Sequence, residues 1–258
     1  MSLVDIDRKM RRRPPARILT IDIERLPGKA WAFDQRTNFI PYRNFIEPPR
    51  TICWAARWLG QSRMMFRAEW LDPDRMVTHA WELFDQADAV ISFNGIRFDM
   101  QHLRGMWLTA GLKPPRPWKD IDLYRQVKPF GFLSNSLDYT ARQLGFTGKT
   151  VHYSIDMAHA AVSGDKEAQR QLRAYNSADV ELTEFLHERL LGWMPNHPHM
   201  GRSLEQSCNQ CGSTDLEKLP SRYRAVVLTY DMFRCQDCGG IVRANFNAVR
   251  VASTTGVR

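Results

Sequence analysis

The stretch Ile18-Leu-Thr-Ile-Asp-Ile-Glu24 decides the fold that we expect for this chain. Its apolar and β-branched residues predict a short buried strand, and the turn residues of Arg25-Leu-Pro-Gly28 end that strand. Side chains alternate between the two faces of a strand, so Asp22 and Glu24 share one face while the isoleucines beside them share the other. The end of a buried strand therefore presents two carboxylates together.

Two carboxylates on one face repel each other unless they are protonated, solvated or bridged by a cation. Oxygen ligands of this kind suit Mg²⁺ or Mn²⁺. The alternative is that the strand end protrudes into water and that Asp22 and Glu24 are both solvated. The short spacing Asp-x-Glu leaves both interpretations open.

Composition indicates a folded protein that binds a polyanion. The 258 residues have room for one large domain with an appendage or for two modest domains, and 43% of them are hydrophobic, which argues against a largely disordered chain. The net charge of +8 favours nucleic acid as the partner. No apolar run reaches the roughly 18 residues of a membrane helix, and the N-terminus does not resemble a signal peptide. We therefore expect a cytoplasmic protein (intracellular, in a reducing compartment) with no membrane association.

The rest of the chain reads as an α/β pattern. Residues 1–16 are rich in arginine and contain two prolines, so we expect a basic flexible arm that either contacts phosphates or only aids solubility. Residues 28–50 are expected to form a surface loop, and Cys53 to lie in the core. We expect strands at 51–59, 63–70 and 87–93, and another strand or a short extended segment at 120–126. Helices are expected at 73–85, 100–110, 134–145, 155–162 and 165–191, and a strand-like segment at 223–233.

A second motif, Asn94-Gly-Ile-Arg-Phe-Asp99, follows the strand at 87–93. Gly95 permits a tight turn between a strand and a helix. Asp99 falls near the start of that helix, where unpaired amides favour a negative charge. A simple helix cap is the alternative role for Asp99.

A third motif lies on the helix at 165–191, where Tyr175 and Asp179 are four residues apart and share a face. An aspartate among the leucines of this face needs a partner. A cation shared with Asp22 and Glu24 would supply one, and an ion pair with an arginine such as Arg142 is the alternative.

Four of the five cysteines form two pairs, Cys208-x-x-Cys211 and Cys235-x-x-Cys238, each followed by glycine. This spacing predicts a Cys₄ zinc ribbon rather than a disulfide framework. His197 and His199 are rival ligands, but four thiolates already complete a tetrahedron.

Taken in order, the three acidic motifs resemble those of the DEDD superfamily of 3′-to-5′ exonucleases, in the tyrosine-containing (DEDDy) branch, which includes the proofreading domains of family B DNA polymerases. The resemblance covers roughly residues 17–191. It implies an RNase H-like mixed sheet flanked by helices, to which the cysteines add a small C-terminal β zinc ribbon. The expected domains are the arm at 1–16, an exonuclease domain at 17–194, a linker at 195–202 and the zinc ribbon at 203–258.

The resemblance also implies a role for each residue of the motifs. The counterparts of Asp22, Glu24 and Asp179 hold one divalent ion, Mg²⁺ or Mn²⁺, and the counterpart of Asp22 bridges to a second. Asp99 would assist the second ion and Tyr175 would orient the attacking water. Asn94 and Phe98 are implied to bind substrate, and Asp122 and Asp138 are given structural roles. The chain departs from the pattern at Arg25, where many relatives have threonine or serine.

The implied activity is two-metal-ion hydrolysis of DNA from single-stranded or frayed 3′ ends, in replication, repair or recombination. An exoribonuclease and a non-catalytic nucleic-acid-binding module with the same fold are the alternatives. The ribbon would grip nucleic acid through basic residues, dock a replication or repair protein, or only close the C-terminus over the core. The basic residues considered are Arg222, Arg224, Arg234 and Arg243.

Overall fold

The structure is a computed structural model that describes residues 16–147, 152–198, 206–225, 228–246 and 248. The chain divides into two compact units, one spanning Arg17–Glu188 and the other containing the part from Arg189 onward. Apart from Ala16, the expected N-terminal arm lies outside the described residues, and so do residues 199–202 of the expected linker, including His199.

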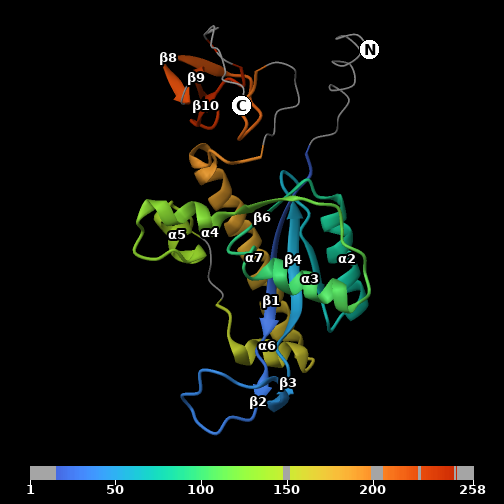
Figure 1. The fold of residues 1–258 in the computed structure, drawn as a ribbon. Helices are drawn as coiled ribbons and strands as arrows, with labels where there is room; N and C mark the ends of the chain where they lie inside the picture. The colour runs from blue at the N-terminus through green and yellow to red at the C-terminus, as the bar shows by residue number, and fades with distance from the viewer. Residues whose placement is uncertain (1–15, 148–151, 199–205, 226–227, 247, 249–258) are drawn as a thin grey trace, which may run out of the picture. The chain divides into compact units, whose positions relative to one another are not determined.

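A five-stranded sheet forms the centre of the Arg17–Glu188 unit, with the strand order β5-β4-β1-β6-β7 (Figure 1). The central strand β1 pairs antiparallel with β4 and parallel with β6, and β6 pairs parallel with β7. The expected mixed sheet is therefore confirmed. The strands are β1 (Ile18–Leu26), β4 (Arg50–Trp58), β5 (Met65–Ala68), β6 (Ala89–Ser92) and β7 (Lys119–Asp122).

The segment between β1 and β4 is more regular than expected. It contains a short hairpin of β2 (Lys29–Ala30) and β3 (Phe45–Glu47), with a 3₁₀ turn at Tyr42–Asn44. The backbone N–H of Trp31 donates to the carbonyl of Asn44 at 2.9 Å, which extends the hairpin beyond its two short strands. The prediction of a simple surface loop at 28–50 was thus wrong for the base of this segment.

Helices cover both faces of the sheet (Figure 1). On one face, the isoleucines of β1 pack with α2 (Pro73–Gln86) and α3 (Asp99–Thr109). On the other face, residues of β4 and β5 pack with α6 (Ile155–Val162) and α7 (Lys166–Leu190). Cys53 is fully buried in this second cluster, as predicted.

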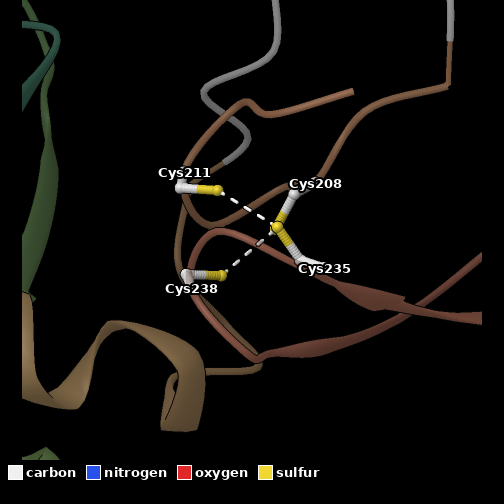
Figure 2. A group of neighbouring side chains, drawn as sticks. All are labelled: Cys208, Cys211, Cys235 and Cys238. Carbon is white, nitrogen blue, oxygen red and sulfur yellow. Dashed lines mark hydrogen bonds between the residues drawn. The ribbon is translucent and has the colours of Figure 1, made fainter. Parts of the chain in front are cut away.

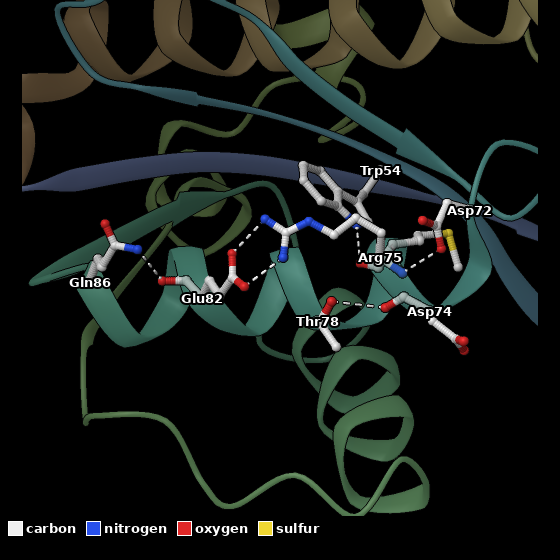
Figure 3. Close-up of polar contacts among 8 residues, drawn as sticks. Trp54, Asp72, Asp74, Arg75, Thr78, Glu82 and Gln86 are labelled. Atoms are coloured by element: carbon white, nitrogen blue, oxygen red, sulfur yellow. Dashed lines mark hydrogen bonds and ion pairs between the residues drawn. The ribbon is translucent and has the colours of Figure 1, made fainter.

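Helix α2 begins where the sequence predicted (Figure 3). The side chain of Asp72 accepts a hydrogen bond from the backbone N–H of Arg75 at 2.8 Å, and a proline occupies the first turn. Two turns along, Glu82 pairs with the Arg75 guanidinium at 2.5 and 2.8 Å. The indole N–H of Trp54 donates to the carbonyl of Met76 at 2.8 Å, which ties β4 to this helix.

The prediction of an extended segment at 120–126 was right only in its first half. Strand β7 ends at Asp122, and a short helix α4 (Leu123–Val127) follows directly. The Asp122 carboxylate accepts a hydrogen bond from the N–H of Tyr124 at 3.1 Å, so the acid caps the helix. A 3₁₀ turn (Lys128–Phe130) and α5 (Leu137–Gln143), capped by Ser136, come next.

The second unit contains an antiparallel three-stranded sheet with the order β10-β9-β8. The predicted strand-like segment at 223–233 is in fact parts of two strands, in which Tyr223 lies opposite Tyr230. A 3₁₀ turn (Leu191–Trp193) precedes this sheet, whose strands are β8 (Leu216–Ala225), β9 (Leu228–Cys235) and β10 (Ile241–Arg243).

Candidate active site and cysteine cluster

Three acids meet beside the end of β1. Carboxylate oxygens of Asp22, Glu24 and Asp179 all lie within 4.8 Å of one another. Asp22 and Glu24 come from β1, and Asp179 from α7, which is 157 positions further along the chain than Asp22. Asp22 and Glu24 pair with Ala55 and Cys53 inside the sheet, so the alternative of a strand end protruding into water is wrong.

A buried asparagine orients Asp22. The side-chain amide of Asn176 donates to the Asp22 carboxylate at 2.6 Å and to the Asp22 carbonyl at 3.2 Å. Asn176 is fully buried on α7, one turn before Asp179. Asn176 was not among the predicted site residues. Its position three residues before Asp179, on the same helix face, was the available signal.

The electrostatics of the cluster fit a bound cation. Burial raises the pKa of Asp22 well above its ordinary value, and the carboxylates of Glu24, Asp99 and Asp179 raise it further. The hydrogen bond from Asn176 opposes this shift. Hard, anionic oxygen atoms gathered in this way match the ligands that Mg²⁺ and Mn²⁺ prefer.

The alternative partner for Asp179 is engaged elsewhere. The Arg142 guanidinium donates to the Asp138 carboxylate at 3.0 Å, one turn earlier on α5. Asp138 therefore has the structural role that the resemblance implied. Asp179 instead makes a hydrogen bond with Tyr175.

Asp99 lies beside the three acids without joining their tight group. It is the first residue of α3 and is 4% exposed. Its Oδ1 accepts a hydrogen bond from the backbone N–H of Ile23 at 3.2 Å, which holds the carboxylate against β1. Burial raises the pKa of Asp99 to about 7, although hydrogen bonds from backbone amides oppose the shift. The role of Asp99 is therefore more than that of a helix cap.

Asp122 builds the turn that positions Asp99. Its carboxylate accepts hydrogen bonds from the N–H groups of Asn94 at 2.9 Å and Ile96 at 3.3 Å. Asn94 adopts φ of 61°, in the left-handed region, where asparagine is tolerated. A Cβ on Gly95 would lie 2.2 Å from the Ser92 hydroxyl, so only glycine fits there. The structural role expected for Asp122 is confirmed, and the backbone of Asn94 shapes the turn.

Tyr175 contacts the acid cluster through its hydroxyl. Burial raises the pKa of this phenol, and the negative charges of Asp179 and Glu24 raise it further. The hydroxyl therefore stays protonated near neutral pH. The ring of Tyr153 lies 6.0 Å from that of Tyr175, and the Tyr153 hydroxyl donates to the Arg25 carbonyl at 2.7 Å. Tyr153 was not predicted, and it ties the end of β1 to Tyr175.

Arg25 follows Glu24 near the end of β1, directly after a register shift in the pairing with β4. Its guanidinium carbon lies 6.0 Å from the centre of the Phe98 ring, and that ring lies 4.9 Å edge-on from the ring of His102. Phe98 is 41% exposed. The end of β1 thus has a cation and an accessible aromatic ring in addition to its carboxylates.

In the second unit, the four cysteines of the two Cys-x-x-Cys pairs converge (Figure 2). The Sγ atoms of Cys208 and Cys238 are 3.7 Å apart, and those of Cys211 and Cys235 are 3.5 Å apart. A tetrahedron with Zn–S distances near 2.3 Å has edges of about 3.8 Å, so these separations suit one zinc ion. They are far longer than a disulfide bond, and all these cysteines are free.

The surroundings of the cysteines favour a cation as well. Burial, together with the neighbouring Cys208, raises the pKa of Cys238 to about 11, although a backbone hydrogen bond from Gly240 opposes the shift. Burial also raises the pKa of Cys235, but backbone amide hydrogen bonds outweigh it and leave a lowered pKa. The buried side chain of Gln210 accepts from the Cys238 thiol at 3.5 Å and donates to the Met194 carbonyl at 3.1 Å. The described rival ligand, His197, instead places a ring nitrogen 3.0 Å from the Pro198 carbonyl.

Most of the arginines that were considered for gripping nucleic acid already have partners within this unit. Arg222 donates to Asp231 at 2.9 Å, and Arg234 donates to the Gly239 carbonyl at 3.1 Å. The Arg243 guanidinium lies 4.1 Å from the centre of the Tyr230 ring. These contacts stabilise the small sheet, so the side chains are only partly available to a ligand.

Comparison with known proteins places the larger unit in a family. The model of the RNase H superfamily matches residues 60–191, just over half of the chain. The chain belongs to the RNase H superfamily. Its mixed sheet flanked by helices is an RNase H-like fold, and this membership indicates a nuclease type of function, which in this superfamily typically uses divalent metals. The matched residues include Asp99, Tyr175 and Asp179, while β1 precedes them.

No curated protein matches the chain. Among the described residues, no helix is both long enough and apolar enough to span a membrane.

Proposed function

We propose that the chain is a metal-dependent 3′-to-5′ exonuclease that hydrolyses DNA from single-stranded or frayed 3′ ends, in replication, repair or recombination. The observation that carries this proposal is the meeting of Asp22, Glu24 and Asp179 within 4.8 Å of one another, with Asp99 and Tyr175 beside them. These five residues match the DEDDy motifs in identity and order. Retention of all five argues against a non-catalytic module.

Asp22, Glu24 and Asp179 would hold a divalent ion, Mg²⁺ or Mn²⁺, and Asp22 with Asp99 would hold a second. When bound, the two ions activate the attacking water and stabilise charge on the phosphate oxygens. Hydrolysis adds water across the terminal phosphodiester bond. It releases a nucleoside 5′-monophosphate and leaves a strand that is shorter by one nucleotide and ends in a 3′-hydroxyl.

Other residues of the chain position the attacking water, the metal ligands and the terminal nucleotide. Tyr175, whose raised pKa keeps its hydroxyl protonated, hydrogen-bonds the water that attacks and orients it rather than removing its proton. Asn176 fixes the Asp22 carboxylate through its 2.6 Å hydrogen bond. Phe98, which is accessible next to Asp99, contacts the terminal nucleotide, and Asn94 shapes the turn that presents it.

We also propose that Cys208, Cys211, Cys235 and Cys238 hold one structural Zn²⁺ and form a zinc ribbon. The two sulfur separations of 3.5 and 3.7 Å support this assignment. The proposed domains are the exonuclease domain at 17–194 and the ribbon at 203–258, joined by the linker at 195–202. The ribbon docks a replication or repair protein, because three of its four candidate arginines are engaged within their own unit.

One experiment tests the reaction. DNA and RNA oligonucleotides of one sequence, labelled at either the 5′ or the 3′ end, are incubated with Mg²⁺, Mn²⁺ or a chelator, and products are resolved over time. We expect a ladder from 5′-labelled DNA, a labelled mononucleotide from 3′-labelled DNA, and no products with the chelator. Internal cleavage of both labelled strands would overturn the exonuclease assignment, and faster RNA cleavage would overturn the choice of DNA.

A further inference from the structure

The hairpin of residues 29–47 carries the most exposed aromatic rings of its unit. Trp31 is 73% exposed, Phe33 106%, Phe39 77% and Tyr42 82%. Among the described residues of the Arg17–Glu188 unit, no aromatic side chain outside this hairpin exceeds the 41% of Phe98. Single exposed apolar residues are ordinary, but four rings on one hairpin indicate an interaction surface.

The rings are exposed although the hairpin backbone is held in place. The Asn44 side chain donates to the Trp31 carbonyl at 3.3 Å and the Asn44 carbonyl accepts from the Trp31 N–H at 2.9 Å. The N–H of Arg36 donates to the Asp34 carboxylate at 2.9 Å, which fixes the outer turn. The rings therefore project from a formed support.

The base of the hairpin is fixed at the active-site end of β1 (Figure 1). A Cβ on Gly28 would lie 2.8 Å from the carbonyl oxygen of Glu47, so the two arms of the hairpin cross closely there. The Arg25 guanidinium donates to the Pro49 carbonyl at 3.1 Å. The five-residue path from Glu24 to Lys29 can span at most roughly 18 Å. A nucleic acid strand at the acids is therefore within reach of the hairpin.

The charged side chains beside the exposed rings indicate which class of partner binds there. Lys29 and Glu47 pair at 3.1 Å, whereas neither Arg36 nor Arg43 has an acidic partner within ion-pair distance among the described residues. The Arg43 guanidinium lies 5.8 Å from the centre of the Tyr42 ring. Accessible rings interleaved with available cations match the bases and phosphates of single-stranded nucleic acid.

We propose that the hairpin is a stacking platform for the single-stranded segment of the substrate that leads into the active site. Bases stack on Trp31, Phe33, Phe39 and Tyr42, and Arg36 and Arg43 contact phosphates. The inference rests on the proposed function, since it assumes a nucleic acid substrate, and it adds that the substrate is held as a single strand for several nucleotides before the 3′ end.

The test measures binding to the full chain carrying Asp22→Asn, which removes a proposed catalytic carboxylate. Fluorescence anisotropy gives Kd for a labelled single-stranded oligothymidylate and for a blunt duplex of equal length. Phe33→Ala added to this chain is expected to raise Kd for the single strand about 5-fold to 100-fold, the usual range for loss of one base-stacking ring. Phe33→Tyr keeps the ring and is expected to leave Kd within about 2-fold.

A matched control is Leu108→Ala, which removes a side chain of similar exposure, 79%, from the far end of α3. It is expected to leave Kd unchanged. An equal Kd for Phe33→Ala, Trp31→Ala and the parent would overturn the platform. If the wild-type chain cleaves oligonucleotides while Trp31→Ala and Phe33→Ala leave KM unchanged, only the platform fails. If the wild-type chain neither binds nor cleaves them, the proposed function fails with it.

Discussion

The acid cluster and the cysteine cluster are built in opposite ways. Asp22, Glu24 and Asp179 come from a strand and a helix that are far apart in the sequence, and the charges of Glu24 and Asp179 add to the effect of burial in raising the pKa of Asp22. The four cysteines come from two short turns within the segment Cys208–Cys238. The first site is assembled by long-range packing, and the second by local chain geometry.

This difference determines what each metal does for folding. The acids are brought together against their mutual repulsion by the apolar clusters that fix β1 and α7. We therefore expect the larger unit to fold without a metal and to bind the proposed Mg²⁺ or Mn²⁺ exchangeably. The small sheet of the second unit has few buried apolar residues, so we expect the proposed Zn²⁺ ion to supply much of its folding free energy.

Removal of one acid is expected to have the largest effect on activity. Asp22→Asn deletes a proposed metal ligand but also relieves charge repulsion, so hydrolysis should fall by roughly 10³ or more while the protein stays folded. Single-turnover rates and the circular dichroism spectrum are measured together. The control is Asp138→Asn, which removes a carboxylate that pairs with Arg142 and should leave the rate unchanged. A wild-type rate for Asp22→Asn would contradict the active-site assignment.

Removal of two thiolates should abolish metal binding at the cysteine cluster and leave the acid cluster intact. Cys208→Ser combined with Cys211→Ser is expected to lose the single bound zinc and to unfold the second unit, because no metal then joins its two turns. Elemental analysis and amide hydrogen exchange report these changes. Hydrolysis of short oligonucleotides should stay within about 2-fold of wild type, since the acids lie in a unit that has its own core.

Cys53→Ala is the matched control, because Cys53 is buried in the larger unit and should not alter the zinc content. Zinc content of one per chain in the double variant would show that the four cysteines are not the ligands. A large loss of activity with the zinc would show that the two units depend on each other.

The two clusters also differ in how far the sequence predicted them. The spacing of the cysteines is local, and the sequence alone was enough to group all four. The acids were grouped through alternation on β1 and through family resemblance. Asn176 and Tyr153 were missed, because their contacts with Asp22 and Arg25 join residues more than 100 positions apart. No periodicity in the sequence reports such contacts.

Errors in the predicted elements have a similar origin. Around Asp122, Ile121 and Leu123 alternate with acids as in a continuing strand, but the Asp122 carboxylate caps a helix and organises the turn at Asn94. The segment at 28–50 has three prolines and lacks a strand pattern. Its hairpin forms because the backbone groups of Trp31 and Asn44 pair. Local hydrogen bonding outweighed propensity in both places.

Tyr175, which contacts the acid cluster, is expected to affect the rate less than the metal ligands do. Tyr175→Phe removes the hydroxyl and keeps the ring beside Tyr153, so the metal ligands are untouched. We expect the chemical rate to fall on the order of 10-fold to 10³-fold, less than for Asp22→Asn. Tyr153→Phe loses only a hydrogen bond to the Arg25 carbonyl and should have a smaller effect. Equal rates for Tyr175→Phe and wild type would remove Tyr175 from the mechanism.

The smallest expected effect, on stability rather than activity, tests the claim that the acids are assembled against their own repulsion. The pKa of Asp99 is raised from 3.8 to about 7 by burial, and that of Asp22 is raised by burial and by its neighbours. Well below pH 3.8 both carboxyls are protonated whether the chain is folded or unfolded. Between about pH 4 and pH 7 the unfolded state loses these protons while the folded state retains them, so the free energy of unfolding falls as the pH rises.

Urea unfolding in the presence of a chelator measures this loss. Seven of the eight tryptophans lie in the Arg17–Glu188 unit, so tryptophan fluorescence follows mainly that unit. We expect the free energy of unfolding to be lower at pH 8 than at pH 5 by roughly 1 to 3 kcal/mol, because each unit of pKa shift corresponds to about 1.4 kcal/mol and relaxation reduces the effect.

Asp99→Asn, which mimics the protonated acid, should shrink this difference, whereas Asp138→Asn should preserve it. Addition of Mg²⁺ at pH 8 should restore stability in the wild type more than in Asp99→Asn, because bound cations offset the charge that burial opposes. The contradicting result is a free energy of unfolding that rises from pH 5 to pH 8 by the same amount in the wild type and in Asp99→Asn. Repulsion among these acids would then not limit the stability of the metal-free fold.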